Sequence, residues 1–131
     1  MANFLNSQNK SDPSDVYAAR GAAAINDFCR LVYQEANAEG VRAEVLFCQA
    51  MWETVWLQFG GDVYSWQCNF GGLGATGGGA TGAVFSSVQV GLRAQAPHVK
   101  AYDSNDPLHN PCVDTRCSLA PIGFSLNIAV L

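Results

Sequence analysis

The sequence predicts a mainly α-helical domain. Apolar residues recur at helical spacing in three segments, residues 15–38, 42–56 and 86–102. Between the last two segments, residues 62–82 are rich in glycine and predict a loop or at most a small β-hairpin. The 131 residues are 49% hydrophobic and 14% charged, a composition that supports a folded core. We therefore expect a polar N-terminal tail over residues 1–12 and a single domain over residues 13–131.

The first predicted helix begins after Ser11-Asp12-Pro13-Ser14, which combines small polar caps with a proline suited to a first helical turn. Apolar side chains then follow at steps of three and four along one face, which should pack against the core. Gly40 is placed to end this helix in a left-handed cap. The residues expected on the buried face are Ala22, Ile25, Phe28, Cys29, Val32 and Ala36.

The second predicted helix runs from Arg42 to Trp56 and is ended by the glycine pair at 60–61. Its spacing places Glu53 on the same face as Gln49 and Trp56. Glu53 is the only carboxylate among the surrounding apolar residues, and no Lys or Arg lies between residues 42 and 93 to pair with it. In general a glutamate lies on the wet side of its helix, and that interpretation stays open here.

A second interpretation of Glu53 is chemical. An apolar, aromatic setting raises the pKa of a carboxyl group, and the negative end of a helix dipole raises it further. A carboxyl group that stays protonated near neutral pH can donate its proton to a departing sugar oxygen. Glu53 is therefore a candidate general acid of a glycosidase.

The glycine-rich stretch contains a formal match to the dinucleotide-binding fingerprint at residues 72–77. That fingerprint requires a strand before it and a helix that opens within it, whereas here a turn precedes it and more Gly, Ala and Thr follow. We expect instead a mobile wall or lid beside a cleft.

The third predicted helix begins at Ser86 or Ser87 and ends at Tyr102, with Pro97 expected to kink or interrupt it. Residues 103–111 contain further prolines and predict a polar loop. The face expected to be buried consists of Val88, Leu92, Gln95 and Val99.

The five cysteines cannot all pair with one another. Cys29 and Cys48 lie in apolar helical patterns and are interpreted as core thiols, whereas Cys112 and Cys117 could form a bridge. His109 precedes those two at a spacing that weakly resembles a zinc site, and a pairing of His98 or His109 with a cysteine nucleophile has no local support. We therefore expect neither a metal nor a cofactor.

Charge and hydropathy argue against several partners. The net charge of −4 argues against a nucleic acid, which needs a basic patch. No run approaches the roughly 20 apolar residues of a membrane span, and no signal peptide is visible.

Four segments, in order, resemble the glucosaminidase domains of glycoside hydrolase family 73. The first, residues 47–63, resembles that family's catalytic-helix motif around Glu53, and residues 69–77 resemble its Asn-Phe-x-Gly segment. Residues 85–102 resemble its Gly-x-Arg-Ala-Gln and His-Leu-Lys-Ala-Tyr patterns, and residues 113–116 resemble a Val-Asp-Pro-Arg segment. The family comprises bacterial and phage peptidoglycan hydrolases, also described as mannosyl-glycoprotein endo-β-N-acetylglucosaminidase-like.

The resemblance implies a lysozyme-like, α-rich fold in which the glycine-rich loop or a small hairpin lines a cleft. It implies hydrolysis of the β-1,4 bond after N-acetylglucosamine in peptidoglycan, with Glu53 as general acid. We expect a monomer that acts outside the cell. The second catalytic group is left open between Asp62, a tyrosine (Tyr102 or Tyr64) and the substrate's own acetamido group. The residues then expected to bind the glycan are Gln49, Trp56, Asn69, Phe70 and Tyr102.

The chain departs from the family pattern at several positions. Val55 stands where Gly is usual, Cys68 where Asn is usual, and Pro97 falls within the third helix. The usual glycine-rich stretch leading to a Trp-Ala motif is missing after Arg116. These departures motivate the alternative of a non-catalytic glycan-binding or degenerate structural domain of the same fold. Its sugar-stacking aromatics would be Trp56, Trp66, Phe70 and Tyr102.

Overall fold

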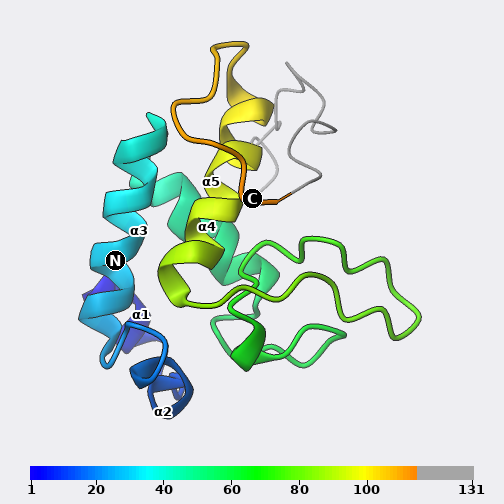
Figure 1. The fold of residues 1–131 in the computed structure, drawn as a ribbon. Coiled ribbons are helices and arrows are strands. Elements are labelled where there is room, and N and C mark those ends of the chain that lie inside the picture. Colours follow the sequence, from blue (N-terminus) through cyan, green and yellow to red (C-terminus); the bar gives the residue numbers. More distant parts are fainter. Residues whose placement is uncertain (115–131) are drawn as a thin grey trace.

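The computed structural model describes residues 1–114, and the predicted mainly helical class is confirmed there (Figure 1). Within those residues an isolated bridge between Gly77 and Ala80 is the one β-type pairing, so the glycine-rich stretch is a loop without a strand. The α-helices are α1 (Ala2–Ser7), α2 (Ser14–Ala18), α3 (Ile25–Glu39), α4 (Ala43–Glu53) and α5 (Val88–Asp103), and η1 (Ser65–Gln67) is a 3-10 helix.

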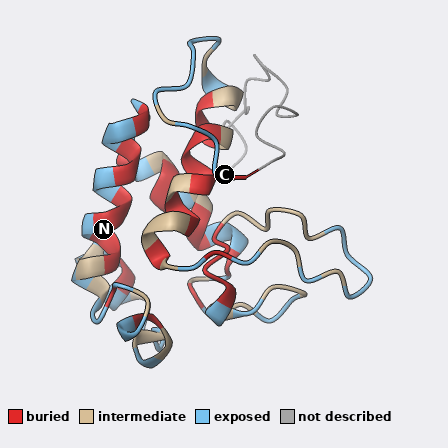
Figure 2. Ribbon diagram, viewed as in Figure 1, coloured by how far each residue is buried: buried red, intermediate tan, exposed pale blue. Residues whose placement is uncertain are grey.

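The core lies where α3, α4 and α5 meet. α3 and α5 run side by side in the same direction, and α4 crosses behind α5 (Figure 1). The buried residues line the facing sides of these helices and the exposed ones point outward (Figure 2). The faces predicted for the first and third helices are confirmed, except that Ile25 is only half-buried.

The predicted first helix is two helices. Gly21 separates α2 from α3 with a φ of +91°, a backbone conformation that glycine adopts without strain. The carboxylate of Asp27 then accepts a hydrogen bond from the Ala24 amide at 3.1 Å and caps the start of α3. Gly40 ends α3 in the left-handed conformation, as predicted.

The segment expected to be a polar tail contains α1, which packs onto the domain. Leu5 is buried in the core, and the ring of Phe4 makes an edge-to-face contact with Trp56 at 5.6 Å between centroids. The two apolar residues in a polar segment are enough to anchor a short helix because both find partners far along the chain.

α4 ends earlier than predicted, at Glu53. The hydroxyl of the buried Thr54 donates to the Ala50 carbonyl at 2.7 Å and accepts from the Leu57 amide at 2.9 Å. Residues 55–57 then have positive φ values of 51°, 60° and 61° and turn the chain away from the helix axis. Helical spacing therefore does not extend to Trp56, and the predicted face shared by Glu53 and Trp56 does not exist.

α5 continues without interruption through Pro97, which is buried. Proline removes one hydrogen bond from a helix interior, but packing against the core outweighs local helix preference in most proteins. The predicted interruption is therefore wrong. Ser87 caps the start of α5 by accepting from the Val90 amide at 3.2 Å.

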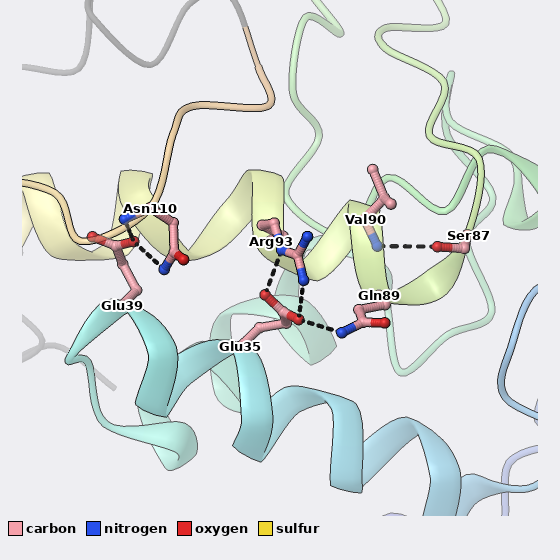
Figure 3. A network of polar contacts seen from close by, with 7 residues as sticks. All are labelled: Glu35, Glu39, Ser87, Gln89, Val90, Arg93 and Asn110. Atoms are coloured by element: carbon pink, nitrogen blue, oxygen red, sulfur yellow. Dashed lines mark hydrogen bonds and ion pairs between the residues drawn. The ribbon is translucent and has the colours of Figure 1, made fainter.

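Two buried carboxylates of α3 hold α5 and the chain beyond it (Figure 3). The Glu35 carboxylate accepts hydrogen bonds from Nε and Nη2 of Arg93, at 2.9 and 3.0 Å, and from Nε2 of Gln89 at 2.7 Å. Glu39 accepts from the amides of His109 and Asn110 at 2.8 and 3.1 Å. These bonds fix the register of α5 on α3, because bidentate Arg–carboxylate pairing is specific in geometry.

The lysine of α5 completes the second of these clusters. Nζ of the buried Lys100 lies 3.5 Å from the Glu39 carboxylate and donates to the carbonyls of Glu39 and Pro107 at 3.0 and 2.8 Å. The predicted loop over residues 103–111 is therefore confirmed as a loop, and it is tied to the end of α3.

The cysteines occupy different environments. Cys29 and Cys68 are buried free thiols, and burial raises the pKa of Cys68 to about 11. Cys48 is an exposed free thiol, so its interpretation as a core residue is wrong. Cys112 is disulfide-bonded, which removes it from the weak zinc pattern, while Cys117 lies outside the described residues.

Candidate functional site

Glu53 is the last residue of α4. Its side chain is exposed to solvent and lies against the glycine-rich loop (residues 71–82). A Cβ on Gly72, where φ is +60°, would lie 3.4 Å from Glu53 Oε2. Residue 72 therefore lies next to the carboxylate, and its positive φ favours glycine at this position.

The carboxyl group of Glu53 has a raised pKa because the surrounding protein removes part of its water. Its position at the negative end of α4 acts in the same direction. The group remains accessible to a ligand while it is biased toward the protonated form. This is the combination that proton donation to a substrate needs.

An amide side chain lies one helical turn before Glu53 on α4, and it pairs with a second amide from α5. Gln49 is half-buried, and its Oε1 accepts a hydrogen bond from Nε2 of Gln95 at 3.0 Å. Gln95 is fully buried, and a Cβ on Gly71 would lie 3.1 Å from its Cγ. Gly71 and Gly72 therefore lie across a polar row that consists of Gln95, Gln49 and Glu53 (the amide–acid row).

Asn69 fixes the start of the glycine-rich loop. It is buried, its Oδ1 accepts from the Leu73 amide at 2.8 Å, and its Nδ2 donates to the carbonyls of Leu73 and Ala83 at 2.9 and 3.1 Å. Asn69 was expected to bind the glycan directly. Its side chain instead forms hydrogen bonds to the backbone of the loop, so it supports the site indirectly.

A second buried amide closes the base of the same loop. Gln67 donates to the carbonyls of Thr81 and Ala83 at 2.8 and 3.3 Å and accepts from the Tyr64 amide at 2.7 Å. The Ala83 amide also donates to the Leu73 carbonyl at 2.8 Å. The loop predicted to be mobile is thus held firmly at both ends, and only its outer part, around residues 74–80, has few bonds.

Two of the predicted glycan-binding aromatics pack against other aromatic rings of the domain. Phe70 is fully buried and packs edge-to-face on Tyr17 and Phe28, at 5.8 and 5.2 Å between ring centroids. Trp56 lies within the left-handed turn and packs on Phe4. Phe70 is a core residue because it lies where the loop segment meets α2 and α3, and Trp56 belongs to the packing of α1.

Neither candidate for a second catalytic group forms a hydrogen bond or ion pair with Glu53 within residues 1–114. Asp62 is half-exposed and follows the turn at 60–61, and no hydrogen bond or ion pair joins it to Glu53. Tyr102 lies seven residues after Gln95, about 10 Å further along α5. Figure 1 shows this end of α5 at the opposite end of the helix from the glycine-rich loop.

Gln95 and Thr54 were not among the site residues predicted from the sequence, and Gly71 and Gly72 were expected only as part of a loop beside the cleft. One signal was present for Gln95. It is a polar residue on the otherwise apolar face of its helix, and a buried polar side chain is an informative exception. The contact of Gly72 with Glu53 joins residues 19 positions apart in the sequence across an irregular loop, and no periodic pattern predicts such an approach.

Exposed aromatic side chains lie in the segments that flank the site. Trp52, next to Glu53, is 71% exposed. Tyr64 and Trp66 are also exposed, and their rings stack nearly parallel, at 12° and 6.4 Å between centroids. Flat exposed rings of this kind offer apolar faces on which a sugar ring can lie.

The described part of the chain offers no evident metal site. No cluster of three or more His, Cys, Asp or Glu side chains suited to a metal ion occurs between residues 1 and 114. None of the helices there combines the length and apolar composition needed to cross a bilayer.

Comparison with known proteins gives one relative without a described function. The chain is 33% identical over 104 residues to an uncharacterized protein of Borreliella burgdorferi (strain B31). The match covers 79% of this chain and 51% of the relative, so the chain spans about half the length of the curated relative it matches. No family model matches the chain, and no solved structure matches it.

Proposed function

We propose that this chain is a glycoside hydrolase of bacterial peptidoglycan with a lysozyme-like fold, related to the family 73 glucosaminidases. It cleaves the β-1,4 bond after N-acetylglucosamine, and Glu53 is the general acid. In this proposal it acts as a monomer on glycan strands outside the cell. The glycine-rich loop and the amide–acid row form one side of the substrate site.

The observation that carries the proposal is the environment of Glu53. A carboxyl group that is accessible, has a raised pKa and ends a helix can hand a proton to the glycosidic oxygen as the bond breaks. The transition state of glycoside hydrolysis resembles an oxocarbenium ion, so protonation of the leaving oxygen lowers its energy.

Backbone geometry at two departures from the family pattern also supports the proposal. Val55 and Cys68 stand where the resemblance expects Gly and Asn, and both have a φ of +51°. Glycine and asparagine are the residues that adopt this left-handed region most readily. The backbone at both positions therefore has the shape that the family's usual residues favour.

The second catalytic group remains a choice between Asp62, Tyr102 and the substrate's acetamido group. A carboxylate partner would need to lie about 5 to 9.5 Å from Glu53, depending on the stereochemistry. Asp62 is closer in sequence and follows a glycine turn, whereas Tyr102 lies at the far end of α5. Of the two side chains, Asp62 is favoured.

A non-catalytic glycan-binding domain is the second candidate. The exposed Trp52 and the stacked pair of Tyr64 and Trp66 favour it, because stacking on sugar rings requires no acid. Under this alternative the chain binds glycan strands and releases no product.

The test is digestion of purified cell wall followed by analysis of the new reducing ends. Reducing-end N-acetylglucosamine is the expected product. Reducing-end N-acetylmuramic acid would identify a lysozyme-type muramidase instead. Absence of any new reducing end on several cell walls, together with retained binding to them, would favour the non-catalytic domain.

A further inference from the structure

The buried amide of Gln95 is not explained by stability. Its Nε2 donates to Gln49, but its Oε1 is buried without a hydrogen-bond partner in the described part of the chain. An unsatisfied buried acceptor is destabilising, and an apolar side chain of the same shape would avoid that cost. Buried polar groups left partly unpaired call for another explanation, and function is a common one.

The pairing has a definite effect on Gln49. Because Gln49 Oε1 is occupied by Gln95, the part of the Gln49 amide left for a ligand is Nε2, which carries two N–H donors. Gln49 is half-buried and lies one helical turn before Glu53, on the same side of α4. A hydrogen-bond donor is therefore held beside the acid.

We propose that Gln95 is a positioning residue that orients the amide of Gln49 to donate to the carbonyl oxygen of a sugar's 2-acetamido group at the site of Glu53. The inference rests on the proposed function and assigns its specificity. A carbonyl oxygen is an acceptor only, so it matches a fixed donor. A hydroxyl at the same carbon is shorter and does not place an acceptor at the same distance from the ring.

Glycine at residue 71 fits this assignment. A side chain there would press on Gln95, because a Cβ would lie within 3.1–3.5 Å of its Cγ, Cδ and Nε2. Gly71 thus leaves the Gln95 amide undisturbed under the loop. The loop backbone, Gln95 and Gln49 form three successive layers from the glycine-rich loop to α4.

The experiment measures binding without turnover, by calorimetry in a Glu53→Gln background. The ligands are the β-1,4 tetramer of N-acetylglucosamine and the β-1,4 tetramer of glucose, which is neutral and lacks the acetamido group. Gln95→Met is the test variant, since methionine has a similar shape and no amide. Gln34→Met, at an exposed position of α3, is the matched control.

The background protein and the control variant should bind the acetylated tetramer more tightly than the glucose tetramer. The Kd of Gln95→Met for the acetylated tetramer should be at least about tenfold higher than that of the background protein, which corresponds to about 1.4 kcal/mol of binding free energy. Its weaker affinity for the glucose tetramer should not change, and its melting temperature should stay the same or rise. Equal affinity for both tetramers in the background protein, no binding of either, or no loss in Gln95→Met would each overturn the assignment.

A third variant guards against a folding defect. Gln49→Met should reproduce the loss caused by Gln95→Met, and the double variant should lose no more than either single change, because the two residues act as one unit. Additive losses would contradict the positioning role. The cell-wall digest with the unmodified protein reports separately on hydrolysis, so failure of this assignment and failure of the proposed activity give different results.

Discussion

Gly91 of α5 lies directly against the backbone carbonyl of Cys68. A Cβ on Gly91 would lie 1.8 Å from that oxygen, far closer than atoms can approach. The contact joins α5 to the segment that leads into Asn69 and the glycine-rich loop. The position of the whole loop beside Glu53 therefore depends on the missing side chain of one helical residue.

Gly91→Ala should destabilise the protein by about 3 kcal/mol or more, because the clash is with backbone and not with a flexible side chain. Thermal or urea denaturation measures the change. Gly61→Ala is the control, since nothing lies within 4 Å of a Cβ there and its φ is not positive, and it should be neutral or slightly stabilising. A fully stable Gly91→Ala protein would mean that α5 and Cys68 are not in this contact.

Glu53→Gln should lower cell-wall hydrolysis by roughly 100- to 10,000-fold, the usual contribution of general acid catalysis. The amide keeps the shape but cannot deliver the proton. Because the pKa of Glu53 is raised by partial desolvation, the folded protein disfavours the ionised form, and the variant should be at least as stable at neutral pH. Glu44→Gln, at an exposed position in the first turn of the same helix, should keep full activity. Unchanged hydrolysis by Glu53→Gln would remove this residue from the mechanism.

Val55→Gly should stabilise the protein modestly. A β-branched residue with a φ of +51° is strained by about 1–2 kcal/mol, whereas glycine adopts this conformation freely and loses about 0.5–1 kcal/mol through added unfolded-state freedom. Val55 is 58% exposed, so little packing is lost. The comparison is Val84→Gly, which is equally exposed but has no positive φ and should be destabilising. If Val55→Gly lost as much stability as Val84→Gly, residue 55 would not be strained.

Acid should weaken the attachment of the loop after α5. Burial opposes ionisation of Glu39, but hydrogen bonds from the Asn110 side chain and from the amides of His109 and Asn110, with the charge of Lys100, lower its pKa overall. A carboxyl group whose pKa is lowered by folding stabilises the protein above its unfolded-state pKa, near 4.5, and this stabilisation is lost as the pH falls through the folded value.

The stability of the unmodified protein should therefore fall more steeply below about pH 4.5 than that of Glu39→Gln. At neutral pH the variant should be less stable by about 3 kcal/mol, because Lys100 is left buried without its ionic partner. Urea denaturation between pH 3 and 7 measures both effects. Parallel curves for the two proteins would show that Glu39 does not hold the loop.

The helical class and most of the core could be predicted from periodicity alone. Val88, Leu92, Gln95 and Val99 share a face because an α-helix repeats every 3.6 residues, and burial follows from that repeat. The placement of Glu53 in the last turn of its helix was also correct. The predicted continuation of this helix to Trp56 was wrong, because the Thr54 hydroxyl donates to the Ala50 carbonyl and a left-handed turn follows. Helical spacing carries no information on such side-chain capping.

The arrangement around Glu53 depends on contacts that no local pattern encodes. Gly72 lies near the carboxylate because the hydrogen bond between Asn69 and the Leu73 amide folds the loop back. Gln49 and Gln95, which are 46 positions apart in the sequence, meet because α4 and α5 cross. Phe70 illustrates the same limit. An aromatic ring beside glycines has the composition of a ligand site, yet it packs into the core once α2 and α3 are present.

The ion pairs between α3 and α5 also bear on the order of events during synthesis. Glu35 and Glu39 leave the ribosome more than fifty residues before Arg93 and Lys100, their buried partners. Until α5 is made, burial of that side of α3 would leave the carboxylates of Glu35 and Glu39 without ionic partners, which costs free energy. The nascent chain must therefore keep α3 open to water on one side, and the domain closes as a unit only when the segment through Asn110 has emerged.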